Sequence, residues 1–303
     1  MALLFCKESV SYITITSMPR FQNSIVRVGL VQMKSGPSAE KNLQRAVASI
    51  KKLAKRGADI VCLPELFLTP YFCQTVDRKN FKLAETVPGP TTRALGAATK
   101  AAGVTVIASV FEQTTQGRYF NTAVVLNEHG KLIGKYRKMH IPDDLKNYYG
   151  EAHYFEPGNL GFRSFKTRRC SIGTLICWDQ WFPEGARATA AKGAQILFYP
   201  TAIGWQPKER LGIKEAEHEA WQVMQRAHAI ANNIFVVAVN RVGLDNKLTF
   251  WGTSFVSDPY GRVIAKAPSN READLLVVCD LSLIPSMRHD WPFLEARRIK
   301  VEK

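Results

Sequence analysis

The sequence of 303 residues predicts an α/β fold, and three observations support this prediction. Short apolar runs that suit buried strands alternate with longer amphipathic stretches that suit helices. The segment RGADIVCLPE at 56–65 is echoed by KGAQILFYPT at 192–201, and each joins a helix end, a glycine, an apolar strand and a proline. No linker rich in Pro, Gly or Ser divides the chain. We therefore expect two similar halves within a single domain that spans residues 25–303.

In the first half we expect strands where apolar residues run together and helices where they recur every three or four positions. Its elements are a strand at 26–33, a helix at 38–56, a strand at 58–65, a helix at 91–102, a strand at 104–112 and a hairpin at 119–126 and 131–136. Ser38 suits the N-cap of the first helix, and Gly57 suits its C-terminal end. Glu128, His129 and Gly130 suit the turn of the hairpin.

The second half repeats the alternation of strand and helix and then ends in strands. Its elements are a strand at 171–178, a helix at 184–192, a strand at 194–202, a helix at 215–232 and strands at 234–240, 251–258, 261–266 and 274–281. Pro183 and Glu184 suit the first turn of a helix. The alternation is typical of sheets that are covered by helices.

Residues 1–24 are expected to form a leader outside the domain. Their only basic residues are Lys7 and Arg20, too few for a transit peptide, and the apolar start at 2–5 is shorter than a signal-peptide core. Met18 stands shortly before the first strand. We expect the leader to be dispensable for folding.

The charge balance is strongly basic, because 41 Lys and Arg against 26 Asp and Glu leave a net charge of +15. Many basic residues between Lys34 and Arg56 alternate with apolar ones at helical spacing, as on the solvated face of a helix. No recognition-helix signature accompanies them, and no apolar run approaches the roughly 18–20 residues of a membrane span. We predict no nucleic-acid partner and no membrane partner. Outside the enzymes, the alternative is a protein that binds nucleic acid or an acidic partner.

The six cysteines show no paired spacing, which indicates reduced thiols and a cytoplasmic location. Five of them suit the usual place of a free cysteine as a small buried residue. Cys177 in LICWDQWFPE differs, because it is expected at the turn from a strand into a helix, where nearby amides favour a thiolate. Glu65 in LPELF and Lys138 in KYRKMHIP also follow strands. Taken singly, a glutamate or a lysine that follows a strand is more often a surface residue.

The segments LPELF, KYRKMHIP and ICWDQWFPE together resemble the nitrilase superfamily, whose members use a Glu–Lys–Cys triad. The resemblance extends over about residues 26–298 and implies a four-layer αββα sandwich. It also implies that Cys177 is the nucleophile, Glu65 the general base and Lys138 the cation that stabilises the oxyanion. The backbone N–H of Trp178 would be a second oxyanion donor.

Glu151 in YYGEAHYFEPG matches a second glutamate of the superfamily, which implies that it orients Lys138 or assists the attack of water. The sequence here reads KNYYGEAHYF, where the family usually reads closer to GYYEKFYF. A loop glutamate on a basic surface is the alternative at this position. No cofactor is expected, and because the histidines lack the spacing of metal ligands, no metal is expected either.

Longer strings are most similar to the branch of the superfamily that hydrolyses N-carbamoylputrescine, namely TPYFCQ, KMHIPD, FYPTAIGW, RAHAIANN, FWGTSFV and WPFLEARR. They imply hydrolysis of a ureido C–N bond to putrescine, carbon dioxide and ammonia. An aliphatic amidase or another N-carbamoyl amide hydrolase, such as one that resembles β-ureidopropionase, is the alternative, because neighbouring branches share several strings. The partner is then a small ureido or amide substrate, and the superfamily implies a homodimer or a larger homo-oligomer.

Seven further residues are candidates for contact with the substrate. Aromatic rings would supply apolar walls and cation–π attraction, and aspartates would pair with a substrate ammonium. The candidates are Tyr71, Tyr149, Trp178 and Trp205 among the aromatic residues and Asp143, Asp144 and Asp179 among the acidic ones.

Overall fold

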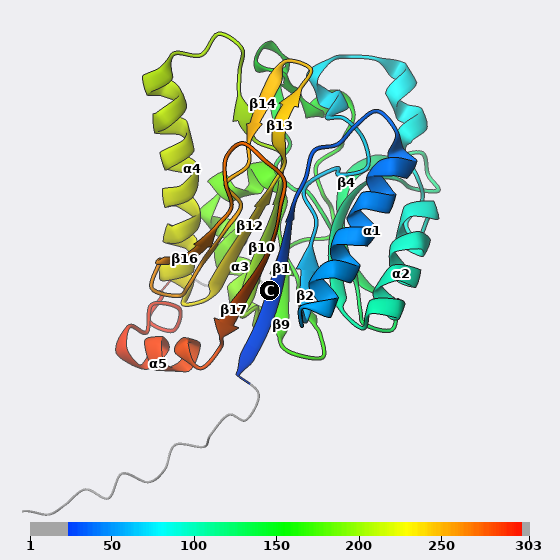
Figure 1. Ribbon diagram of the computed structural model, residues 1–303. Coiled ribbons are helices and arrows are strands. Elements are labelled where there is room, and N and C mark those ends of the chain that lie inside the picture. Colours follow the sequence, from blue (N-terminus) through cyan, green and yellow to red (C-terminus); the bar gives the residue numbers. More distant parts are fainter. Residues whose placement is uncertain (1–23, 299–303) are drawn as a thin grey trace, which may run out of the picture.

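Two six-stranded sheets, stacked face to face, form the centre of the computed structural model, which describes residues 24–298 (Figure 1). In the middle of each sheet three strands run parallel, and antiparallel strands flank them on both sides. The leader expected at 1–24 lies outside the described residues, apart from Ser24.

The first sheet has the order β17-β1-β2-β3-β4-β5. The elements of the first half are β1 (Ile25–Gln32), α1 (Ala39–Lys55), β2 (Ile60–Cys62), α2 (Pro90–Ala102), β3 (Thr105–Gln113), β4 (Tyr119–Leu126) and β5 (Leu132–Arg137). At the edge of this sheet, β17 (Ala273–Asp280) pairs with β1. Ser38 caps α1 as expected, since its side chain accepts a hydrogen bond from the N–H of Lys41 at 3.3 Å.

The second sheet has the order β16-β15-β12-β10-β9-β8. Its strands and helices are β8 (Ser164–Lys166), β9 (Ser171–Thr174), α3 (Pro183–Ala191), β10 (Ile196–Thr201), α4 (Leu211–Asn232), β12 (Phe235–Asn240), β15 (Phe255–Ser257) and β16 (Val263–Lys266). The two echoed segments form β2 and β10, and each is the middle strand of its parallel triplet. The echo in the sequence therefore marks equivalent positions in two similar halves.

Smaller elements lie in the connections between the strands. They are β6 (Asp143–Asp144), β7 (Tyr149–Gly150), β11 (Gly204–Trp205), β13 (Val242–Asp245), β14 (Leu248–Trp251), α5 (Leu283–Asp290) and the short 3-10 helices Phe72–Gln74, Arg78–Leu83, Leu145–Asn147, Glu151–His153 and Cys177–Trp181. The hairpin of β13 and β14 projects from the end of the sheets toward which β1 and β2 run (Figure 1).

Helices cover the outer face of each sheet, so the protein has the four αββα layers that were expected (Figure 1). Leu53 of α1 and Leu95 of α2 share a core with Val61 of β2. On the other side, α3 and α4 cover the second sheet. Between the sheets, Leu30 of β1 and Phe198 of β10 belong to one continuous apolar core. This shared core holds the two sheets together.

Two expected strands are interrupted. The strand expected at 171–178 ends early because Cys177 has a φ of 41°, outside the range of extended backbone. The strand expected at 251–258 is divided between β14 and β15 because Gly252 has a φ of 59°. In addition, α4 begins at Leu211, before the expected start.

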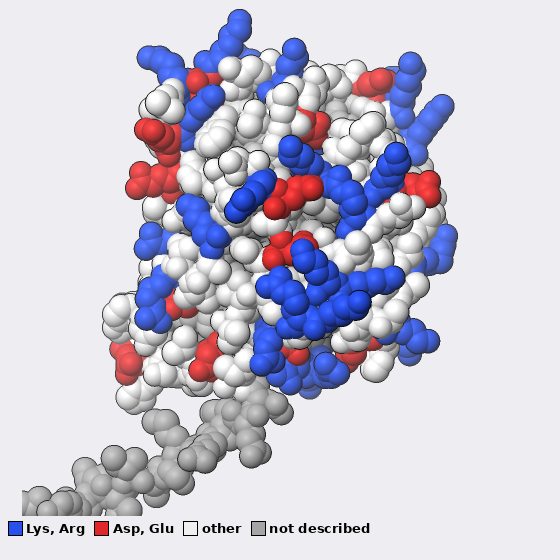
Figure 2. All heavy atoms as spheres, viewed as in Figure 1, with Lys and Arg blue, Asp and Glu red and all other residues white. Residues whose placement is uncertain are grey.

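The basic surplus lies on the surface. Figure 2 shows Lys and Arg side chains gathered over the C-terminal end of α1, where Lys51, Lys55 and Arg56 are exposed. Lys52 of the same turn pairs with Asp274 of β17 at 2.9 Å. This region therefore has the solvated helix face that the sequence predicts. Within residues 24–298, no helix has both the length and the apolar character that a membrane crossing needs.

Candidate active site

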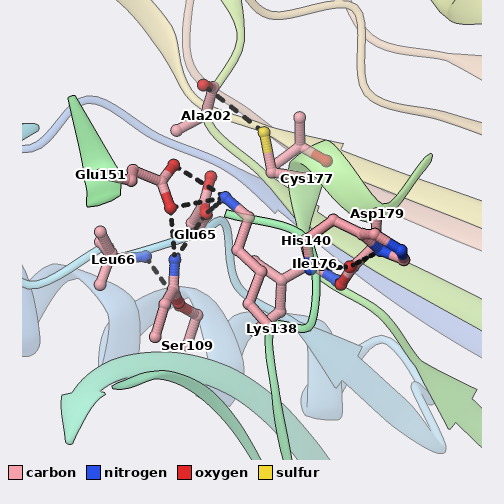
Figure 3. Close-up of polar contacts among 12 residues, drawn as sticks. Glu65, Leu66, Ser109, Lys138, His140, Glu151, Ile176, Cys177, Asp179 and Ala202 are labelled. Atoms are coloured by element: carbon pink, nitrogen blue, oxygen red, sulfur yellow. Dashed lines mark hydrogen bonds and ion pairs between the residues drawn. The ribbon is translucent and has the colours of Figure 1, made fainter. Parts of the chain in front are cut away.

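The residues of the expected triad meet at the end of the sheets toward which the parallel strands run. Glu65 lies three residues after β2 and Cys177 three residues after β9, so they come from opposite sheets. Lys138 directly follows β5, and Glu151 begins a 3-10 helix in the next loop. All four residues are buried, with at most 4% of their surface exposed. Residues that are far apart in the sequence thus form one buried cluster (Figure 3).

Lys138 is the centre of this cluster. Its Nζ lies 2.9 Å from Oε1 of Glu65 and 2.7 Å from both carboxylate oxygens of Glu151. Figure 3 shows the amino group pointing between the two carboxylates. A buried ammonium group needs such partners, because an unpaired charge in a protein interior costs several kcal/mol. Glu151 is therefore a buried partner of Lys138 and not a surface glutamate.

The carboxylate of Glu65 is held so that one oxygen stays free. Its Oε1 accepts a hydrogen bond from Nδ2 of Asn121 at 2.7 Å, in addition to the one from Lys138. Ser109 orients this amide, since its Oγ donates to Oδ1 of Asn121 at 2.9 Å. Within residues 24–298, Oε2 of Glu65 is buried without a hydrogen-bond partner. A free carboxylate oxygen is what a proton acceptor requires.

The sequence did not single out Asn121 or Ser109. Both residues are fully buried within strands, Ser109 in β3 and Asn121 in β4. A polar residue inside an apolar strand is the one signal that could have found them, because a buried polar group needs a hydrogen-bond partner.

Tyr71 supports Glu151 instead of lining the cavity where a substrate would bind. Its hydroxyl donates to Oε1 of Glu151 at 2.7 Å, and 1% of its surface is exposed. Its backbone N–H donates to Oδ2 of Asp245 at 2.8 Å. The expectation of a substrate contact at Tyr71 is thereby corrected, because its hydroxyl donates its hydrogen bond to a carboxylate of the cluster.

Cys177 opens a 3-10 helix at a sharp turn. Its φ of 41° is left-handed, which costs a residue other than glycine on the order of 1–3 kcal/mol. The thiol donates to the carbonyl of Ala202 at 3.7 Å (Figure 3). Burial raises the pKa of the thiol, Glu65 raises it further, and Lys138 opposes them without reversing the shift. The expected thiolate is therefore not the resting state, and the thiol needs a base to activate it.

The buried cluster also contains a carboxyl group with the properties of a base. Burial raises the pKa of Glu65 to about 7, against the attraction of Lys138. Burial likewise opposes the charge of Lys138, but Glu151 and Glu65 outweigh it, and the pKa of Lys138 is well above its usual value. A carboxyl group with a pKa near 7 can take up and return a proton at neutral pH. A proton that moves from Cys177 to Glu65 leaves the total charge of the cluster unchanged, so no net charge is created in a buried site.

Asp179 stabilises the turn at Cys177 and is not free to bind a substrate. Its Oδ2 accepts hydrogen bonds from the N–H of Ile176 at 3.0 Å and from the hydroxyl of Tyr136 at 2.8 Å. Its Oδ1 accepts from the N–H of His140 at 3.0 Å and lies 2.8 Å from Nδ1 of the same residue. Asp179 is fully buried. The expectation that it pairs with a substrate ammonium is therefore wrong.

A cavity of about 330 Å³ opens onto Cys177 and Glu151. This size suits a small molecule. Among the expected contacts, Asp144, Tyr149 and Trp178 line the cavity. The aromatic side chains of its wall are Tyr149, Trp178, Trp181 and Trp251, of which the sequence had not singled out the last two. A larger cavity of about 770 Å³ lies beside α5, and no residue of the cluster lines it.

Two other expected contacts lie outside this cavity. Asp143 is exposed, and it is not among the described residues that line the wall. Trp205 packs behind the wall, with its ring centroid 5.6 Å from that of Trp251 and its Nε1 donating to the carbonyl of Lys214 at 3.0 Å. Trp205 is therefore not part of the described wall but packs against Trp251, which is.

The charged side chains of the cavity wall are acidic. Among the described residues that line it, Asp144, Glu151 and Glu217 are acidic, and none is Lys or Arg. Burial raises the pKa of Glu217 to about 7, and the nearby carboxyl of Glu209 adds to the shift. A bound cation would stabilise the ionised form of this carboxyl. The sequence did not reveal Glu217, because a glutamate in a helix is most often solvated, and only the fold brings this one to the cavity.

No metal-ligand cluster is present within residues 24–298, where no three His, Cys, Asp or Glu side chains gather around one point. Two of the histidines are held by hydrogen-bond partners of their own. His228 lies 2.7 Å from the carbonyl of Gln180, and His218 lies 2.9 Å from Oγ1 of Thr253.

The chain is similar to known proteins over most of its length. A family model described as carbon-nitrogen hydrolase matches residues 27–289. The N-carbamoylputrescine amidase of Solanum lycopersicum is 38% identical over 286 residues, which cover 91% of this chain and 93% of that protein. The citrullinase of Francisella tularensis is 36% identical and covers 90% of this chain and 95% of its own. A carbon-nitrogen hydrolase from Helicobacter pylori G27, known from a crystal structure, is 38% identical with a TM-score of 0.86, covering 90% of this chain and 96% of its own.

Replacement of Lys138 by methionine is expected to destabilise the protein in a pH-dependent way. Without the cation, Glu65 and Glu151 are two neighbouring buried carboxylates, so folding has to protonate at least one of them. Because carboxyl groups in the unfolded chain ionise above about pH 4.3, this cost grows as the pH rises. We expect the free energy of unfolding, measured with urea, to fall by about 3–5 kcal/mol at pH 8 and by less at pH 6.

Lys135→Met is the matched control for this experiment. Lys135 lies 2.5 Å from Oε1 of Glu112, and its side chain is 25% exposed. After the replacement, the Glu112 carboxylate would still be paired with Arg137, which lies 2.8 Å from Oε1. We expect a loss of about 1 kcal/mol or less, nearly equal at pH 6 and pH 8. A similar loss in both variants, or a Lys138→Met loss that does not change with pH, would contradict the role of Lys138 in the cluster.

Proposed function

Because the chain belongs to the carbon–nitrogen hydrolase family, within the nitrilase superfamily, we propose that it hydrolyses the ureido C–N bond of N-carbamoylputrescine to putrescine, carbon dioxide and ammonia. The observation that supports this most is the cavity itself. The thiol of Cys177 lines it, the free carboxylate oxygen of Glu65 and the amino group of Lys138 belong to the same buried cluster as Glu151 of its wall, and the charged residues of the wall are acidic.

We assign the first chemical step to Cys177, Glu65 and Lys138. Oε2 of Glu65 takes the thiol proton as Sγ attacks the ureido carbon, so the carbonyl oxygen becomes an oxyanion. A ureido carbonyl is a poor electrophile, and the step needs positive charge where the oxyanion forms. Nζ of Lys138 supplies it. The N–H of Trp178 is a second donor, since N–H groups in the first turn of a helix have no acceptor within that helix.

The intermediate then collapses and is hydrolysed. Glu65 returns its proton to one nitrogen of the ureido group, which leaves as ammonia or amine, while the carbonyl carbon stays bonded to Sγ as a thioester. Water loses a proton to Glu65 and attacks this carbon, and the thiol of Cys177 leaves with that proton. The released carbamic acid decomposes to carbon dioxide and the second nitrogen product. One water is consumed in total, and the enzyme returns to its initial state.

The cationic end of the substrate is assigned to the acidic part of the wall. N-carbamoylputrescine has an ammonium group four carbons from its ureido nitrogen, and Glu217 and Asp144 line the same cavity as Cys177. Tyr149, Trp178 and Trp251 offer apolar surface for the chain between the two ends and faces for cation–π attraction. This local acidity also explains how a protein of net charge +15 can bind a cation, because the wall contributes the nearest charges.

The alternative is an aliphatic amidase or another N-carbamoyl amide hydrolase with the same triad. The similarity to a citrullinase supports this alternative. Citrulline and N-carbamoyl-β-alanine, however, have a carboxylate, and no Lys or Arg is among the described residues that line the cavity. The acidic wall therefore favours the substrate that has a cation and no carboxylate.

Release of putrescine would place the reaction in polyamine biosynthesis. A cytoplasmic location and a homo-oligomer stay predictions.

The substrate and the nucleophile are tested together by ammonia release from N-carbamoylputrescine. We expect turnover by the wild-type protein, at least tenfold better in kcat/KM than for citrulline, N-carbamoyl-β-alanine or simple amides. We expect none by Cys177→Ala, which should keep its fold because it removes only a sulfur atom. Preference for a carboxylate substrate would overturn the proposed substrate, and equal turnover by Cys177→Ala would overturn the proposed nucleophile.

The role of Glu217 is tested with a charged and a neutral substrate. We expect Glu217→Gln to raise the KM for N-carbamoylputrescine about 10-fold to 100-fold, since a hydrogen bond to a charged group contributes about 1.5–3 kcal/mol. The same variant should leave the KM for N-pentylurea unchanged, because this analogue has a methyl group in place of the ammonium.

Glu219→Gln is the matched control, because Glu219 is an exposed residue of the same helix. It should leave both KM values unchanged. A Glu217→Gln variant that raises both KM values equally, or neither, would show that Glu217 does not bind the ammonium.

A further inference from the structure

The base and the nucleophile are held by different sheets, so their separation depends on how the sheets are joined at this end. Glu65 follows β2 of the first sheet, and Cys177 follows β9 of the second. A shift of about 1 Å between reacting groups can cost about 10²-fold in rate. The core between the sheets is apolar, and apolar packing is not directional. A directional link between the two loops is therefore needed.

Arg241 makes such a link. It directly follows β12 of the second sheet, yet its guanidinium binds the loop after β2 of the first sheet. Its Nε donates to the carbonyl of Glu65 at 2.9 Å, and one terminal nitrogen donates to the carbonyls of Leu66 and, at 2.8 Å, of Thr69. The side chain is 1% exposed. A rigid guanidinium that donates to three carbonyls of one loop fixes the backbone of that loop.

The loop needs this support because of its backbone conformation. Leu66 has a φ of 46°, in the left-handed region that leucine rarely adopts. Its N–H donates to Oγ of Ser109 at 3.1 Å (Figure 3). Ser109 also orients Asn121, which binds Oε1 of Glu65. The loop is thus held by Ser109 from the first sheet and by Arg241 from the second.

The end of β12 is also attached to the segment that borders the thiol. The N–H of Arg241 donates to the carbonyl of Thr201 at 3.3 Å. The side chain of Asn240 accepts from the N–H of Ile203 at 3.1 Å and donates to its carbonyl at 3.0 Å. Between them lies Ala202, whose carbonyl accepts the hydrogen bond of the thiol. Two adjacent residues thereby join the loop of the base to the segment beside the nucleophile.

Asp245 extends this link to the second glutamate. Its Oδ2 lies 3.2 Å from a terminal nitrogen of Arg241 and accepts the N–H of Tyr71 at 2.8 Å. The hydroxyl of Tyr71 in turn donates to Glu151 at 2.7 Å. Arg241 is therefore connected to both carboxylates that bind Lys138.

We propose that Arg241 is a positioning residue, which sets the separation between the carboxylate of Glu65 and the thiol of Cys177 by tying the loop after β2 to the end of β12. The proposal rests on the proposed function, because it takes Cys177 as the nucleophile and Glu65 as the base. Arg241 is not among the described residues that line the cavity. The chemical step should therefore depend on Arg241, and substrate binding should not.

The test compares Arg241→Lys with Arg226→Lys in the full-length protein. Lysine keeps the charge but cannot reach three carbonyls at once, so we expect kcat to fall about 10²-fold while KM stays within about threefold. The pH below which kcat/KM falls should also move upward, because Glu65 loosened from Lys138 loses the partner that lowers its pKa. Arg226 is the matched control, since its Nε donates to the carbonyl of Gly261 at 2.6 Å in a loop without site residues. Its variant should match the wild type.

A milder second variant covers the case in which Arg241→Lys does not fold. Asp245→Asn keeps the shape of the link and weakens its charge, and we expect kcat to fall about 5-fold to 10-fold with KM unchanged. Folding is checked by circular dichroism, and rates are measured well below the melting temperature of each variant. A folded Arg241→Lys with the kcat and pH profile of the wild type would overturn the proposal. If that variant does not fold, an unchanged kcat in Asp245→Asn would overturn it.

Mass spectrometry of the wild-type protein during turnover separates this proposal from the proposed function. An acyl adduct on Cys177 supports the proposed mechanism, and an unaltered Arg241→Lys variant would then overturn only the positioning role. Turnover that proceeds through an adduct on another residue would overturn the proposed mechanism and the positioning role together.

Discussion

The pairing of one buried ammonium group with two buried carboxylates is the interaction on which the rest of the site depends. Lys138 can stay charged without contact to water because three oxygens of Glu65 and Glu151 lie within 2.9 Å of its Nζ. The same burial raises the pKa of Glu65 to about 7 and raises that of the Cys177 thiol. A neutral thiol therefore stands beside a carboxylate that can accept its proton, and the transfer creates no net charge in the interior.

The doubled fold explains how such a cluster is assembled. Each half of the chain builds the parallel triplet at the centre of one sheet, and a loop from each triplet lies at the same end of the sandwich. One loop contributes Glu65 and the other Cys177, while Lys138 directly follows β5, the antiparallel strand at the edge of the first sheet. The shared apolar core brings the sheets together, and polar contacts such as those of Arg241 give the two loops a defined separation.

The sequence predicted what local patterns encode and missed what depends on contacts across the fold. Glu65, Lys138 and Cys177 could be predicted from the sequence because each follows an apolar strand in a recognisable segment. Asn121 and Arg241 could not be predicted, because each depends on a hydrogen bond to Glu65, which lies 56 positions from Asn121 and 176 from Arg241. Asp179 was misassigned because its nearness to Cys177 in the sequence suggested the cavity, whereas its carboxylate accepts the backbone N–H of Ile176. The thiol was expected as a thiolate because the turn alone favours one, whereas its burial and then the nearby Glu65 raise its pKa.

The central claim, that Glu65 accepts the proton of Cys177, is tested most directly by the dependence of kcat/KM on pH in a Glu217→Gln background. This background removes Glu217, a second carboxyl group whose pKa is raised to about 7. Below its pKa Glu65 is protonated and cannot act as a base, so kcat/KM should fall tenfold for each pH unit below about 7 and stay level above it. A value that is constant down to about pH 5, or one that keeps rising tenfold per unit through about pH 9 as a thiol ionising on its own would require, would contradict the account.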